Sequence, residues 1–285
     1  MSRVVLVHGI GQQYKGEETL LADWYPALAD GMALASDVRL PREDVSMAFY
    51  GDLFRPAGHR GLGIPELDAS DVSDDMERDL LIQWWTYAAE IDPRVPGPDA
   101  PARLRTPYLV QRALDALSHS AFFAGLSERF LIWSARQVRV YFTDAEVRSA
   151  VQRRMERGVT ARTEVIVAHS LGSVVAYEAL CAHPEWQELS FVTLGSPLGI
   201  RNLTFDRLTP RPVDGRGHWP EPVKRWINVA DRGDVVPVVK RLADRFGDGI
   251  EDVSIHNGAR AHDVTRYLTA RETGRRIAET LTPDP

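Results

Sequence analysis

Short apolar runs rich in β-branched residues alternate with helical patterns along most of this chain of 285 residues. Such runs are typical of strands buried on both faces of a parallel sheet that helices cover on either side. The pattern predicts six strands: Val4–Val7, Val45–Tyr50, Val165–Ala168, Phe191–Leu194, Trp226–Ala230 and Val253–His256. The sequence therefore predicts an α/β fold with a mostly parallel six-stranded sheet flanked by helices.

Helical patterns fall between most of the predicted strands. Leu20, Trp24 and Leu28 recur every four residues, which predicts a first helix with one buried face. A last helix is predicted over Tyr267–Leu281, where a Thr-Pro-Asp-Pro tail follows and ends it.

A third helix start is predicted from a capping motif. Thr143 and Glu146 have the spacing of a capping box, in which the two side chains bind free amides of the first helical turn. Gly158 suits the far end of that helix. We therefore expect this helix to lead the chain back into the sheet at Val165.

The interval between Tyr50 and Val165 is more than 100 residues long, far longer than one crossover helix needs. It contains two helical patterns, Asp75–Ile91 and Ala102–Phe142, the second of them interrupted. We predict that residues 56–142 form a helical cap inserted into a core of residues 1–55 and 143–285. Large aromatic side chains enrich this interval, and they either line an acyl pocket or form the cap's own core: Trp84, Trp85, Tyr87, Phe122, Phe123, Phe130 and Trp133.

A tight turn is predicted where the strand Val165–Ala168 meets the following helix. The segment Ala168–Gly172 (AHSLG) places a serine between small residues, which is typical of a nucleophile elbow, although Ala168 stands where such turns usually have glycine. The turn lifts the serine hydroxyl above the sheet and directs free helix amides at the reaction centre. Ser170 is therefore the candidate nucleophile, with a turn that has no chemical role as the alternative.

The segment His8-Gly9-Ile10-Gly11 directly follows the predicted N-terminal strand. An oxyanion hole requires two backbone amides aimed at the carbonyl oxygen on which negative charge develops. We expect one amide from Leu171, next to the serine, and the other from Ile10. Gly9 and Gly11 allow the backbone to come close, and His8 is expected to brace the loop.

These segments resemble the α/β-hydrolase superfamily, and lipase- and esterase-like serine hydrolases in particular. The resemblance is carried by residues 4–11 (VVLVHGIG), 167–172 (VAHSLG) and 193–197 (TLGSP). It covers the first 50 residues and roughly residues 144–281, and leaves the predicted cap unmatched. It implies a minimal core that lacks the first two strands of the full fold. It also implies a triad in the order serine, acid, histidine, with the last two in the loops after the final two strands.

Asp234 and His262 match those two positions. Asp231, directly after a predicted strand, is the alternative acid, and His256, at the end of the last predicted strand, is the alternative base. A serine hydroxyl is a weak nucleophile at neutral pH, so His262 would take its proton while Asp234 holds the imidazole. This chemistry needs no cofactor and no metal ion.

The expected activity is hydrolysis of a carboxylic ester with a small-molecule or lipid-like acyl group. Thioesterase, phospholipase and amidase activities use the same triad and remain alternatives, as does a catalytically silent protein that only binds a ligand. The formal net charge of −6 disfavours nonspecific binding to nucleic acid.

Two further features bear on where the protein is expected to act. The most apolar stretch, residues 122–142, is interrupted by charged side chains and predicts no transmembrane segment. The N-terminal apolar run is too short for a signal peptide, and the single cysteine, Cys181, forms no intramolecular disulfide. We therefore expect a cytoplasmic protein.

Overall fold

The computed structural model describes residues 2–55, 66–98, 106–120 and 127–281. Its centre is a sheet of six strands in the order β2-β1-β3-β4-β5-β6, in which every neighbouring pair is parallel. The strands are β1 (Val4–Val7), β2 (Val45–Ala48), β3 (Val165–His169), β4 (Leu189–Leu194), β5 (Val223–Asp231) and β6 (Ile250–Ile255). The predicted α/β class and parallel six-stranded sheet are confirmed.

Two strands begin three residues earlier than predicted, β5 at Val223 and β6 at Ile250, and β6 ends at Ile255, one residue before His256. The first half of β6 was not predicted because it contains Glu251 and Asp252, and charged residues are uncommon in buried strands. β6 is an edge strand, and its charges have partners. Glu251 pairs with Arg225 and Arg276, and Asp252 accepts a hydrogen bond from Asn228 Nδ2 at 2.7 Å.

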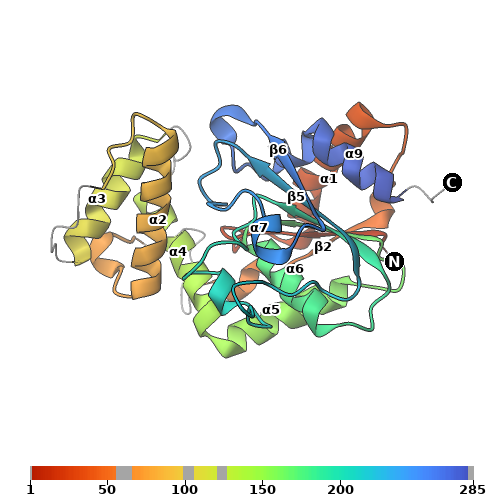
Figure 1. The fold of residues 1–285 in the computed structure, drawn as a ribbon, viewed down its shortest axis with the longest axis horizontal. Coiled ribbons are helices and arrows are strands. Elements are labelled where there is room, and N and C mark those ends of the chain that lie inside the picture. The colour runs from red at the N-terminus through yellow and green to blue at the C-terminus, as the bar shows by residue number, and fades with distance from the viewer. Residues whose placement is uncertain (1, 56–65, 99–105, 121–126, 282–285) are drawn as a thin grey trace.

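Helices cover both faces of the sheet (Figure 1). One face packs against α1 (Glu17–Ala35), α8 (Val264–Thr269) and α9 (Arg271–Leu281). The other packs against α5 (Ala145–Gly158), α6 (Leu171–Ala182) and the short α7 (Ala243–Phe246). The described residues also form five short 3₁₀ helices: η1 (Arg42–Asp44), η2 (Gly51–Phe54), η3 (Ala69–Asp71), η4 (Phe205–Arg207) and η5 (Gly258–Arg260).

Two predicted helices differ from those observed. The last one is divided, because the backbone of Ala270 is extended between α8 and α9 (ψ 129°), and both parts pack against α1. The start of α5 is capped by Asp144 rather than Thr143. The Asp144 carboxylate accepts hydrogen bonds from the amides of Glu146 and Val147, both at 3.0 Å. The Thr143 hydroxyl is used elsewhere, donating to the carbonyl of Arg139.

The long interval folds into three helices that pack on one another: α2 (Asp75–Ile91), α3 (Thr106–Ser118) and α4 (Glu128–Thr143). We call them the three-helix unit. Figure 1 shows α2 and α3 beyond one end of the sheet, with α4 between them and the sheet. The predicted bounds of α2 are confirmed, and the interrupted pattern contains α3 and α4. Phe122 and Phe123 lie outside the described residues.

The capping of α5 gives a direct test of the local structure. Asp144→Ala should lower the free energy of unfolding by about 1 kcal/mol, because two first-turn amides lose their acceptor. Thr143→Ala is the matched control and should change it by less than about 0.5 kcal/mol. Urea unfolding of both variants measures the difference, and a larger loss for Thr143→Ala would contradict the assignment.

Candidate active site

The predicted site residues lie where the order of the strands reverses. From β1 the chain continues to β2 on one side, while β3 lies on the other side of β1. Loops that leave the carboxyl ends of β1 and β3 therefore diverge and open a crevice, the usual ligand site of open α/β sheets. The loop Gly9–Gly11 follows β1, and Ser170 follows β3.

Ser170 joins β3 to α6 in a strained turn. Its backbone has φ 53° and ψ −131°, and a positive φ is unusual for a residue with a side chain. Its amide donates to the carbonyl of Leu194 at 3.0 Å. Its own carbonyl accepts from the amide and the hydroxyl of Ser173, at 2.9 and 2.6 Å. These bonds hold the strain in place, and Ser170 is 4% exposed.

Two glycines let β1 approach this turn. A Cβ atom at Gly9 would lie 2.7 Å from the Cβ of Ser170, and a Cβ at Gly172 would collide with the carbonyl oxygens of Val7 and His8. Only glycine therefore fits at positions 9 and 172, where β1 and the turn after β3 meet. Leu171 is the first residue of α6, so its amide has no intrahelical acceptor. Ile10 lies in the loop on the other side of the turn.

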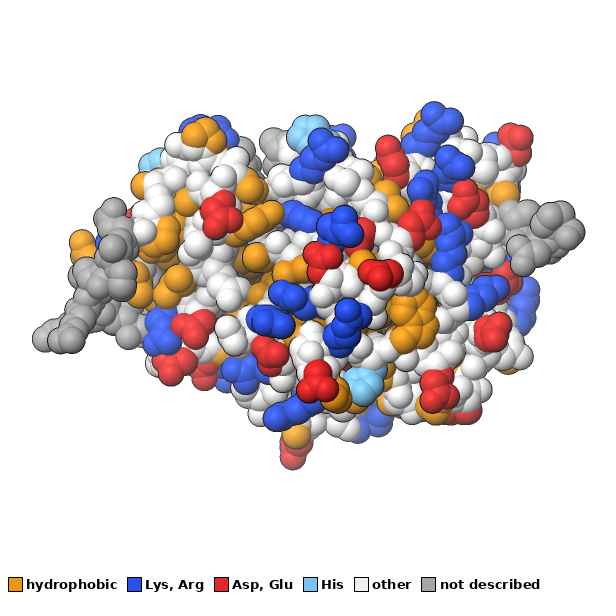
Figure 2. Space-filling model, viewed as in Figure 1, with side chains coloured by type: hydrophobic (Ala, Val, Ile, Leu, Met, Phe, Trp, Pro, Cys, Tyr) orange, Lys and Arg blue, Asp and Glu red, His pale blue; other side chains and the backbone are white. Residues whose placement is uncertain are grey.

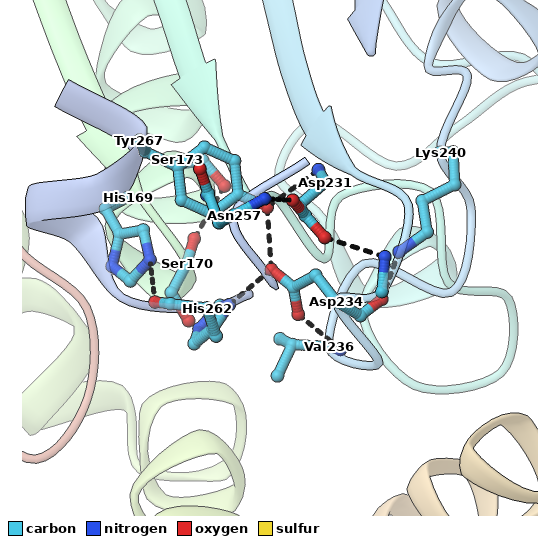
Figure 3. Close-up of polar contacts among 11 residues, drawn as sticks. His169, Ser170, Ser173, Asp231, Asp234, Val236, Lys240, Asn257, His262 and Tyr267 are labelled. Carbon is cyan, nitrogen blue, oxygen red and sulfur yellow. Dashed lines mark hydrogen bonds and ion pairs between the residues drawn. The ribbon is translucent and has the colours of Figure 1, made fainter. Parts of the chain in front are cut away.

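Asp234 and His262 are brought together in the loops after β5 and β6 (Figure 3). Asp234 Oδ2 lies 2.7 Å from His262 Nδ1, and the carboxylate is completely buried. Because a carboxylate accepts, Nδ1 of His262 carries the proton and Nε2 is the basic nitrogen. The hydroxyl of Tyr267 donates to the same Oδ2 at 2.7 Å, and the amide of Val236 donates to Oδ1 at 2.9 Å.

The two alternative residues have other positions. The carboxylate of Asp231 accepts from the amides of Gly233 (2.7 Å) and Asn257, and so braces the loop that carries Asp234. His256 is exposed at the end of β6.

Three residues around the pair had not been predicted as part of the site. Burial and the nearby Asp234 raise the pKa of Tyr267 well above its usual range, so its hydroxyl stays protonated. Gly195, with φ +55°, would place a Cβ 3.0 Å from Asp234 Oδ2 and 3.1 Å from His262 Nδ1. Lys240 Nζ donates to the Asp234 carbonyl, and burial lowers its pKa to about 8. Only Gly195 had a sequence signal, in the segment TLGSP.

His169 lies against His262. Its ring centroid is 4.5 Å from that of His262, and its Nε2 lies 3.1 Å from the carbonyl oxygen of His262. Burial lowers the pKa of His169 well below its ordinary value, so the ring is neutral at neutral pH. A neutral Nε2–H can donate this bond, which fixes the backbone of the loop that carries His262.

His8 braces the loop after β1. It is 1% exposed, its Nδ1 lies 2.7 Å from the carbonyl oxygen of Gly9, and its Nε2 accepts from the amide of Tyr50 at 3.1 Å. Burial lowers the pKa of His8 to about 4, so it is neutral when it makes these bonds.

A cavity of about 620 Å³ lies above Ser170, and helices of the three-helix unit contribute to its wall. Ser170, His169 and His262 line it from the core, and Ile10 and Gln12 from the loop after β1. Trp84 of α2 and three residues of α4 close another side: Phe130, Leu131 and Ser134. The remaining wall residues come from α1, from the start of α8 and from the segments that follow β1, β5 and β6: Lys15, Asp23, Trp24, Val236, Arg260, Ala261, Asp263, Val264 and Thr265.

The surface carries no uniform charge on the face drawn in Figure 2, where basic and acidic side chains are interspersed. Within the described ranges, no helix is long and apolar enough to cross a membrane. Nor do the described residues include a cluster of three or more His, Cys, Asp or Glu side chains that could hold a metal ion.

No protein-family model matches the chain, and no curated protein is similar to it in sequence. The geometry of the site therefore carries the functional argument.

The pKa of His8 predicts a pH dependence of stability. Between pH 6.5 and 4 the unfolded chain binds a proton at His8 that the folded protein does not, so stability falls as the pH falls. From pH 6.5 to 5.0 this loss is about 1.5 kcal/mol. In His8→Gln, the decrease in unfolding free energy over this range should be smaller by that amount. Urea titrations at both pH values measure it, and an equal decrease in both proteins would contradict the assignment.

Proposed function

We propose that this protein is a serine hydrolase of the α/β-hydrolase type that cleaves carboxylic esters. One observation carries the proposal: the buried Asp234–His262 pair, with Oδ2 to Nδ1 at 2.7 Å, shares a cavity with Ser170 in its strained turn. Serine, imidazole and carboxylate in this relation make a hydroxyl nucleophilic at neutral pH.

The reaction would proceed in two halves. The Ser170 hydroxyl attacks the ester carbonyl while Nε2 of His262 removes its proton, and the proton then passes to the departing alcohol. Water attacks the resulting acyl-enzyme in the same way and releases the acid. The amides of Leu171 and Ile10 would stabilise the oxyanion in both halves. Asp234 stabilises the imidazolium that forms transiently and holds its orientation.

The topology supports the proposal. Ser170, Asp234 and His262 follow β3, β5 and β6 in that order, which agrees with the triad order implied by the resemblance. Asp234, rather than Asp231, is our proposed acid, and His262, rather than His256, is our proposed base.

We further propose that the three-helix unit is a cap that selects the acyl group. Trp84, Phe130 and Leu131 give the cavity a largely apolar wall, and its volume suits a small molecule or a medium-sized acyl chain. The unit also contacts the triad loop, because Lys240 Nζ lies 5.2 Å from the centre of the Tyr87 ring. Thioesters, phospholipids and amides are alternative substrates for the same groups.

Replacement of the nucleophile tests the proposal. Ser170→Ala should lower the kcat for p-nitrophenyl esters by about 10⁴–10⁶-fold, because the only attacking group of the mechanism is lost. Ser149→Ala is the matched control, since it removes an exposed hydroxyl on α5 that does not line the cavity. Substantial ester hydrolysis by purified Ser170→Ala protein would overturn the proposal.

Paired variants test the roles of the acid and the base. His262→Ala should cost nearly as much activity as Ser170→Ala, and Asp234→Asn about 10⁴-fold in kcat. His256→Ala should retain most activity, because this side chain is exposed outside the cavity. An inactive His256→Ala beside an active His262→Ala would show that the wrong base is named.

The cap proposal predicts a change of selectivity. Phe130→Ala enlarges the cavity and should raise kcat/KM for p-nitrophenyl octanoate relative to the acetate several-fold. Tyr108→Ala, on the exposed surface of α3, is the control and should leave the ratio unchanged. A lower melting temperature with an unchanged ratio in Phe130→Ala would mean that the three-helix unit has no part in selection.

A further inference from the structure

Two oxygen atoms in residues that line the cavity are buried without a hydrogen-bond partner. They are Oε1 of Gln12 and Oγ of Ser134, and neither has a hydrogen-bond partner among the described residues. Buried polar groups are nearly always paired, so an unpaired one calls for a physical explanation, and a group that binds it from the adjoining cavity is one. Ser134 is 2% exposed, so bulk solvent does not supply a hydrogen bond to its hydroxyl.

Both atoms lie beside the loop that carries the proposed oxyanion amide. α4 crosses this loop, since Gln137 Oε1 accepts from the Gly11 amide at 3.1 Å and a Cβ at Gly11 would lie 3.3 Å from the Phe130 ring. Ser134 is four residues after Phe130 and three before Gln137, so it shares their face of the helix. Gln12 follows Gly11 directly.

The chemistry of the two groups defines what they can bind. Nε2 of Gln12 donates to the carbonyl of Ile10 at 3.3 Å, which fixes the amide and leaves Oε1 as an acceptor. An acceptor requires a donor from the ligand. The Ser134 hydroxyl can both accept and donate. Apart from Ser134, the part of the wall that the three-helix unit forms is apolar, with Phe130, Leu131 and Trp84.

We propose that Gln12 and Ser134 form a polar subsite for a hydroxyl or amide N–H group that the substrate carries close to the scissile carbonyl, on an otherwise apolar body. This inference rests on the proposed esterase function and names its substrate class. The subsite favours a substrate with that donor over an isostere without it, because the isostere leaves both oxygen atoms unpaired.

Matched ester pairs test the subsite. For the hydroxyl, ethyl 3-hydroxybutanoate is compared with ethyl 3-methylbutanoate, and for the amide, ethyl N-acetylglycinate with ethyl 4-oxopentanoate. We expect kcat/KM to favour the donor-bearing ester about tenfold or more in at least one pair. The pair that shows the preference identifies the source of the donor. Ratios near one, or below one, in both pairs would overturn the proposal.

Variants of Gln12 and Ser134 test whether these two residues cause the preference for donor-bearing esters. Ser134→Ala and Gln12→Leu should each bring the ratio down toward one, while Ser118→Ala, on the exposed end of α3, should keep it. If the kcat/KM ratio of the donor-bearing ester to its isostere is unchanged in both variants, Gln12 and Ser134 do not form the subsite, even if the native protein shows a preference.

Binding separates this inference from the esterase proposal. Ligand-detected NMR with Ser170→Ala protein gives Kd values for the same esters without turnover, and the donor-bearing ester should bind about tenfold more tightly. If the native protein hydrolyses no ester but this preference appears, the esterase function fails and the subsite stands. If hydrolysis occurs but neither the rates nor the Kd values show a preference, the subsite alone fails.

Discussion

The end of β1 and the start of α6 touch through their backbones, because Gly172 lies against the carbonyl groups of Val7 and His8 and Gly9 lies against Ser170. Every other feature of the site depends on this contact. It brings the loop after β1 to the strained turn after β3, and the two loops diverge from there to form the crevice. A side chain larger than hydrogen at either glycine would separate them. The free amide of Leu171 and the loop amide of Ile10 could then not act on one oxyanion.

The second constraint is a completely buried carboxylate. A charge without solvent is stable only when several groups bind it, and Asp234 accepts from His262, Tyr267 and the amide of Val236. These contacts come from three parts of the chain, so Asp234, His262 and α8 hold each other in position. Lys240 adds a link to α2 through the ring of Tyr87. The position of the three-helix unit is thus coupled to the loop that carries Asp234.

Much of this arrangement could be predicted from local sequence. The strands are continuous β-branched runs, and the serine turn has small residues on both sides, so both follow from short segments. The start of β6 could not be predicted, because its two charges depend on distant partners. Arg225 and Arg276 bind Glu251, and Asn228 donates to Asp252. Tyr267 and Gln137 were also missed. Their importance comes from partners 33 and 126 residues away, which no local pattern contains.

The predicted residues differ in how far the structure supports them. From the sequence, Asp231 and Asp234 were alternative candidates for the triad acid, three residues apart. In the folded loop, Asp234 accepts a hydrogen bond from His262, whereas Asp231 accepts from backbone amides. The cap was predicted from its length and its aromatic side chains alone. Its contribution to the wall of the cavity depends on how α4 packs against the loop after β1, which is a property of the tertiary structure.

The most direct measurement of the central claim is the intact mass of the protein after brief treatment with a fluorophosphonate, with the modified peptide then mapped. Such reagents react with a serine that a neighbouring base activates. A triad of Ser170, His262 and Asp234 predicts a single adduct on Ser170, formed rapidly in the native protein and not in His262→Ala. No adduct, or one on Ser173 or Ser196 in its place, would contradict it.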